Sequence, residues 1–144
     1  MLKFQEFYDG TLHGVLSWQQ LTAFWSKIKA DSESDSGWYV YAVGHPLPAA
    51  PVSAQLLTRF ISETDALLRR DHREDYCGIV YADDLEKPSF VKIFDPNKLG
   101  SSCGSSKNPP PPGWILSRVP PNEITSKDIV PEQRKRWLAS IFGA

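Results

Sequence analysis

The sequence has few of the residues that build metal sites, disulfide frameworks or cofactor sites. Its 144 residues include two cysteines, Cys77 and Cys103, and three histidines that lie far apart. No Cys-x-x-Cys or His-x-x-x-His pair is present, so we expect no metal site. Glycine motifs of the Gly-x-Gly-x-x-Gly and Gly-Lys-Ser/Thr kinds are also missing, so we expect no nucleotide cofactor and no other cofactor.

Neither sign of charge is in excess. The chain carries 16 Lys and Arg residues against 17 Asp and Glu residues, for a formal net charge of -1. This balance gives no bulk attraction to nucleic acid or to anionic lipid. The cationic clusters, at 69–70 and 134–136, are each expected to cover a solvated helix face. We therefore expect no nucleic-acid partner.

Long apolar runs are also missing. The least charged stretch, 37–58, is interrupted by His45 and three prolines, whereas a membrane-spanning helix needs about 20 mainly apolar residues. We therefore expect no membrane partner. Residues 1–6 contain one lysine and no apolar run of the signal-peptide kind, so we expect a cytoplasmic protein in which both thiols are free.

The residues that are present predict a single α+β domain over 1–144. Apolar residues make up 41% of the chain, enough to fill a core at this length. Apolar residues recur at spacings of three and four from Trp18 to Ile28 and from Leu56 to Leu68, which predicts two amphipathic helices. Ser17 and Ser53 are the predicted N-caps. A third helix is predicted to start at Pro131.

Four stretches have the composition of strands, at 38–43, 77–82, 89–94 and 114–119. The first is apolar on both alternating faces, which predicts a central strand of the sheet. The second and third are closely joined and predict an antiparallel hairpin. The order of elements therefore indicates a mainly antiparallel four-stranded sheet with about three helices packed on it.

The segment 95–113 is rich in Ser, Gly, Pro and Asn. It exceeds the length of about 12–15 residues beyond which unstructured loops are uncommon in compact domains. Its thiol, Cys103, stands among residues whose amides and hydroxyls could hold an anion. The predicted ligand-binding residues are Gly100, Ser101, Ser102, Gly104, Ser105 and Trp114. The prolines at 109–112 either stiffen the exit of this loop or bind an aromatic-lined groove.

Two functions are consistent with these features. The first is a small module that binds a protein partner or a small ligand through the 95–113 loop and the sheet ends. The alternative is a thiol-dependent enzyme or redox protein, with Cys103 as nucleophile, His45 as base and Asp95 as the residue that orients His45. His45 and Asp95 each follow a predicted strand, where loops from neighbouring strands gather.

The four residues Tyr81-Ala82-Asp83-Asp84 resemble the Tyr-x-Asp-Asp element of reverse-transcriptase palm domains. The resemblance implies paired carboxylates that hold two divalent metals for phosphoryl transfer. The residues that follow, Leu85-Glu86-Lys87-Pro88, do not form an apolar returning strand, which favours a different interpretation, a polar hairpin turn.

Overall fold

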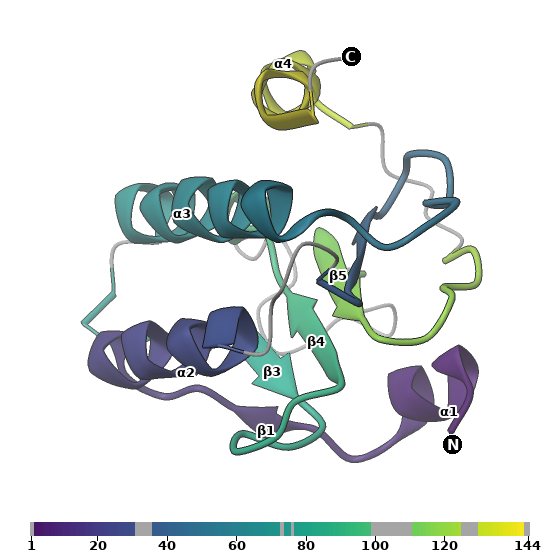
Figure 1. The fold of residues 1–144 in the computed structure, drawn as a ribbon. Helices are drawn as coiled ribbons and strands as arrows, with labels where there is room; N and C mark the ends of the chain where they lie inside the picture. Colours follow the sequence, from purple (N-terminus) through teal and green to yellow (C-terminus); the bar gives the residue numbers. More distant parts are fainter. Residues whose placement is uncertain are drawn as a thin grey trace.

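A computed structural model describes residues 2–30, 36–72, 74–75, 77–98, 111–124 and 130–142. In this part of the chain the elements are α1 (Phe4–Asp9), β1 (His13–Gly14), α2 (Trp18–Ala30), β2 (Tyr39–Ala42), α3 (Ala54–Asp71), β3 (Val80–Ala82), β4 (Phe90–Ile93), a 3-10 turn (Pro96–Lys98), β5 (Trp114–Ser117) and α4 (Glu132–Phe142) (Figure 1). The predicted α+β class is confirmed. The sheet has five strands rather than four.

All strand pairs of the sheet are antiparallel, in the order β1-β3-β4-β5-β2. The predicted hairpin is confirmed as the β3–β4 pair, in which Val80 faces Ile93. The additional strand, β1, consists of His13 and Gly14 paired with Ala82 and Tyr81. Two residues are too few to leave a periodic pattern in the sequence, so β1 is found only through its pairing.

The prediction that 38–43 forms a central strand is wrong, because β2 lies at the edge of the sheet. It is hydrogen-bonded to β5, and Tyr39 faces Ser117 at its start. On its other side the backbone N–H of Val52 donates to the carbonyl of Trp38 at 2.9 Å. Both faces of β2 are nevertheless covered, since Val40 and Tyr41 are buried in different clusters. An apolar run reports covered faces, not the number of neighbouring strands.

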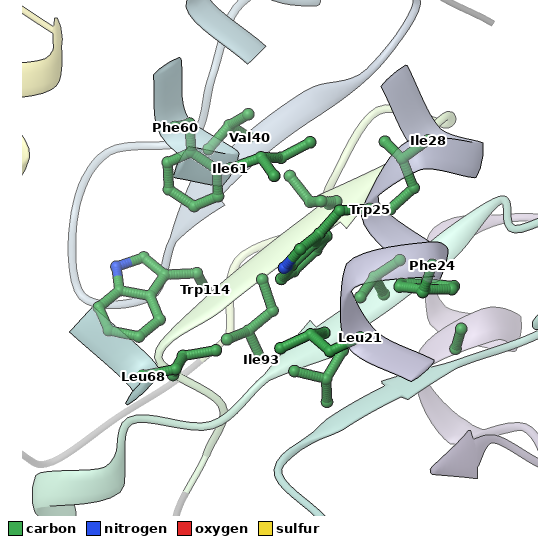
Figure 2. Close-up of a cluster of buried hydrophobic side chains, with 14 of the residues drawn as sticks. Leu21, Phe24, Trp25, Ile28, Val40, Phe60, Ile61, Leu68, Ile93 and Trp114 are labelled. Atoms are coloured by element: carbon green, nitrogen blue, oxygen red, sulfur yellow. The ribbon is translucent and has the colours of Figure 1, made fainter. Parts of the chain in front are cut away.

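Helices α2 and α3 cover one face of the sheet (Figure 1). Both predicted caps are present: the amide of Gln20 donates to Ser17 Oγ at 3.0 Å, and that of Leu56 donates to Ser53 Oγ at 3.1 Å. Figure 2 shows the buried side chains between helices and sheet, among them Leu21, Phe24, Trp25, Ile28, Val40, Phe60, Ile61, Leu68, Ile93 and Trp114. Each such side chain contributes about 1.5–3 kcal/mol relative to exposure.

The short helix α1 covers the opposite face of the sheet. Phe4 meets Phe90 edge to face with ring centroids 5.4 Å apart, and Phe7 stacks on Phe90 at 5.6 Å. This helix was not predicted from the sequence, although Phe4, Phe7 and Tyr8 have the spacing of one helical face. Six residues are below the length at which such spacing is a dependable signal.

Helix α4 packs beside α3 at the end of the molecule where β2 and β5 lie (Figure 1). The Trp137 ring lies 5.3 Å from that of Trp114, and Arg59 Nη2 donates to the carbonyl of Ser140 at 2.6 Å. In the described part of the chain, the helices are too short or too polar to cross a membrane.

Candidate functional site

A tight turn after β2 places His45 at the end of the sheet. Gly44 has a φ of 95°, in the left-handed region, and the amide of His45 donates to the carbonyl of Ala42 at 3.0 Å. A Cβ on Gly44 would lie 2.8 Å from Cγ2 of Val130. Glycine is therefore required here twice, once by the backbone conformation and once by the close neighbour.

A cavity of about 480 Å³ lies beside His45, between β2, the segment 44–52 and α4. This volume is within the range of about 300–1,000 Å³ that is typical of small-molecule sites. Most of its walls are apolar. The lining residues are Val40, Ala42, Gly44, His45, Pro46, Pro48, Val52, Lys135, Leu138, Ala139 and Phe142.

One stripe of α4 forms a wall of this cavity. Lys135, Leu138, Ala139 and Phe142 follow the i, i+3, i+4, i+7 spacing that puts side chains on one helix face. Leu138 and Phe142 are half-buried, and the Phe142 ring lies 6.1 Å from that of the buried Phe60. The cavity wall is therefore continuous with the hydrophobic core.

Among the described residues that line the cavity, two have polar side chains, His45 and Lys135. Burial lowers the pKa of His45 below 6.5, and the nearby Lys135 lowers it further. His45 is therefore mainly neutral at pH 7, with one ring N–H to donate and one ring nitrogen to accept. The Lys135 side chain is 48% exposed, and its ammonium lies 3.5 Å from Glu132. Among the described lining residues, Lys135 has the one ammonium group.

His45, Asp95 and Trp114 meet at a second, much smaller crevice of about 20 Å³. That space holds about one water molecule. The structure gives Asp95 a partner other than His45. Its Oδ2 accepts from Arg134 Nε at 2.9 Å, and its Oδ1 accepts from Arg134 Nη2 at 3.1 Å. Trp114 is 5% exposed, so little of its ring is accessible to a ligand.

Arg134 corrects the expectation that 134–136 covers a solvated helix face. Its side chain is 8% exposed, and Nη2 also donates to Asp71 Oδ2 at 2.9 Å. Arg70 Nε donates to the other oxygen of Asp71 at 2.8 Å. Arg70 and then Arg134 lower the pKa of Asp71 to about 2. Arg134 points inward because α4 packs over the ends of β4 and α3, where Asp95 and Asp71 lie.

A second hollow, of about 420 Å³, lies over this ion network on the other side of α4. It is lined by Arg70, Asp71, Asn97, Gln133, Arg134 and Trp137. Both arginines there are paired with carboxylates. This hollow is therefore polar and internally neutralised.

Both ends of the 95–113 loop are fixed next to the sheet. The amide of Gly113 donates to the carbonyl of Ile93 at 2.9 Å, and the amide of Val43 donates to the carbonyl of Gly113 at 3.0 Å. Gly113 also lies against Asp95, at the other end of the loop. Cys103 and five predicted ligand-binding residues lie outside the described residues, namely Gly100, Ser101, Ser102, Gly104 and Ser105. Their roles stay predictions.

The other thiol, Cys77, is fully buried. Burial raises the pKa of the Cys77 thiol, which suppresses the reactive thiolate form. Cys77 is therefore a core residue and not a nucleophile.

Asp83 and Asp84 hold the β3–β4 turn. Asp83 Oδ1 accepts from the amides of Ser89 and Phe90, at 2.8 and 3.0 Å. Asp84 Oδ1 accepts from the amide of Glu86 at 2.8 Å. These contacts agree with the hairpin-turn interpretation of 81–88, and the described residues contain no cluster of three potential metal ligands.

The α4 side of the cavity was not predicted from the sequence. The sequence does contain the spacing of two stripes along α4. Lys135, Leu138 and Phe142 share one helical face, and Arg134 and Ile141 share the adjacent face. Both stripes contain apolar residues, so the pattern alone cannot say which one faces the core.

Comparisons of the chain with protein-family models, with curated proteins and with solved structures found no match.

Proposed function

We propose that the protein is a binding module that takes a small, mainly apolar ligand into the cavity at the end of β2. One observation carries this proposal: a cavity of about 480 Å³ with apolar walls also presents two polar side chains, His45 and Lys135. Apolar walls provide affinity, while a few placed polar groups orient the ligand. The site lies at a sheet end, where the sequence analysis expected binding.

A packing defect is the competing explanation for the cavity. Protein interiors have few voids larger than a water molecule, and apolar surface left in water costs about 25 cal/mol per Å². Helix α4 could close the space only by moving, and contacts outside the cavity hold it in place. These contacts are the Arg134 ion pairs with Asp95 and Asp71 and the Arg59–Ser140 hydrogen bond. A cavity kept open by contacts outside it supports a binding role.

The 95–113 loop belongs to the same proposal through its two ends. Asp95 and Gly113 line the small crevice, and His45 lines both this crevice and the larger cavity. A ligand beside His45 would therefore lie next to Asp95 and Gly113, the two ends of this loop. A protein partner is the other possible occupant, because Leu47 is 44% exposed between the lining residues Pro46 and Pro48.

A thiol-dependent enzyme is the second candidate function. One observation favours it: His45 is mainly neutral at pH 7, as a general base must be. Asp95 does not support it as the orienting group, because both carboxylate oxygens of Asp95 accept from Arg134. The binding proposal needs only described residues, so it ranks first.

The binding proposal is tested with N-phenyl-1-naphthylamine, a neutral dye that fluoresces in apolar surroundings. We expect saturable fluorescence enhancement with the full chain. Ala139→Trp fills the cavity from its α4 wall. It should weaken dye binding at least about tenfold, because the indole ring occupies the space that the dye needs. The matched control, Arg136→Trp, adds the same ring at an exposed position of the same helix.

Circular dichroism and thermal unfolding of both variants confirm that the fold is intact. Two results would overturn the proposal: no saturable enhancement with the unmodified chain, or equal dye affinity in Ala139→Trp and Arg136→Trp.

A further inference from the structure

We propose that the ligand of this cavity is a carboxylate with an apolar chain or ring. Its carboxylate would lie between Lys135 and His45, and its apolar body would lie against Leu138 and Phe142. This inference rests on the proposed function, because it names the class of ligand for the same cavity.

The charge distribution around the cavity selects an anion. The described residues that line the cavity include no acidic side chain, but they include the cationic Lys135. Glu132, the partner of Lys135, is 77% exposed and lies outside the lining. Exposed ion pairs of this kind contribute about 0–1 kcal/mol. A ligand carboxylate that is less exposed to water could therefore replace Glu132 at little cost.

A carboxylate close to His45 is already neutralised. Asp95 lies in the crevice that shares His45 with the cavity, but Arg134 binds both of its oxygens. The Arg134 side chain is 8% exposed and the Asp95 side chain 5%, so this pair is little screened by water. The field that a ligand meets beside His45 is therefore dominated by Lys135.

The number of donors favours a carboxylate over a phosphate. A lysine ammonium supplies one positive charge, and a neutral imidazole supplies one ring N–H. Together they match the single charge and two oxygens of a carboxylate. A phosphate dianion commonly relies on arginine forks or several backbone amides. Arg70 and Arg134, on the other side of α4, do not line this cavity.

The size of the cavity sets the length of the apolar part. At about 30 Å³ for each water-sized group in a liquid, a cavity of about 480 Å³ has room for about sixteen non-hydrogen atoms. Octanoate fits within this space. Its eight-carbon analogues 1-octanol and octylammonium keep the chain and change only the head group.

The closing experiment measures the affinity of the full chain for these three compounds by isothermal titration calorimetry at pH 7. We expect octanoate to bind about tenfold more tightly than 1-octanol, and octylammonium to bind more weakly than 1-octanol, because Lys135 attracts the first head group and repels the last. Lys135→Gln should remove the advantage of octanoate. The matched control, Arg136→Gln, makes the same charge change one residue along α4, at an exposed position outside the lining.

Two results would overturn the inference while leaving the cavity proposal in place. One is an affinity for 1-octanol equal to that for octanoate. The other is an equal loss of octanoate affinity in Lys135→Gln and Arg136→Gln. If none of the three compounds binds and N-phenyl-1-naphthylamine also fails to bind, the cavity proposal itself is overturned.

Discussion

Two hollows flank helix α4, and they differ in how their charges are balanced. In the polar hollow, Arg70 and Arg134 are paired with carboxylates. In the apolar cavity, the partner of Lys135 among the described residues is the exposed Glu132. Residues 134 and 135 are adjacent in sequence, yet one is buried in a network and the other lies at the mouth of a cavity.

This difference separates an anchor from a proposed binding surface on a single helix. The helix face that carries Arg134 and Ile141 fixes α4 to the ends of β4 and α3. The charged groups of Arg134 are therefore already paired within the protein. The helix face that carries Lys135, Leu138 and Phe142 presents half-buried apolar side chains and a weakly paired ammonium. Buried charges stay only where they are paired, so the first stripe should dominate stability and the second should dominate binding.

The strongest test of the anchor is to remove its central cation. Arg134→Met leaves Asp95, whose side chain is 5% exposed, without its ion pair. We expect a loss of about 3–5 kcal/mol in the free energy of unfolding, the cost of breaking a buried pair. Urea denaturation measures it. Arg136→Met, at an exposed position, should change stability by less than about 0.5 kcal/mol, and equal losses in the two variants would contradict the assigned role.

The second test concerns the turn that carries His45 into the cavity. Gly44→Ala forces a side chain into a left-handed conformation and places its Cβ against Val130. We expect a loss of about 1–3 kcal/mol in stability and weaker dye binding. Adding Val130→Ala should remove the clash and not the backbone strain. If Gly44→Ala is as stable and binds dye as well as the unmodified chain, the turn does not position the site.

A third test titrates the anchor. The pKa of Asp71 is lowered from 3.8 to about 2 by Arg70 and Arg134. A lowered native pKa adds stability that is fully present above pH 4 and is lost as the pH falls through about 2. We expect this loss to be on the order of 2 kcal/mol at most, and it is measured by denaturation at each pH. Asp71→Asn should lack this step, and an unchanged step in that variant would assign it to another group.

The last test concerns the reactivity of the two thiols. Iodoacetamide should leave Cys77 unmodified in the native protein, because it is buried and its pKa is raised. In the Cys77→Ala background, the pH dependence of alkylation then reports Cys103 alone. A Cys103 pKa near the ordinary value of about 8.5 would count against the thiol-enzyme function, and one below about 7 would favour it.

The longer elements of the fold could be predicted from local patterns. The stripes of α2 and α3, their serine caps and the β3–β4 hairpin depend on neighbours within a few residues. Short or edge elements could not. Strand β1 exists through its pairing with β3, and β2 looks central because both of its faces are covered while only one side has a strand partner.

The site could be predicted only in part for a related reason. His45 was expected at a sheet end because it follows a strand, and it does line the cavity there. Lys135 and Phe142 reach it from a helix about 90 residues further along the chain, and no sequence spacing reveals such a contact. The inward turn of Arg134 depends in the same way on Asp95 and Asp71, which come from other elements.

The central claim is that the cavity between β2 and α4 is a ligand site, and amide chemical shifts test it most directly. Titration of the ¹⁵N-labelled full chain with N-phenyl-1-naphthylamine should give saturable shifts concentrated at Ala42, Gly44, His45, Leu138 and Ala139, which line the cavity. Shifts concentrated instead at Arg70, Asn97 and Gln133 around the polar hollow, or no saturable shifts at all, would contradict the account.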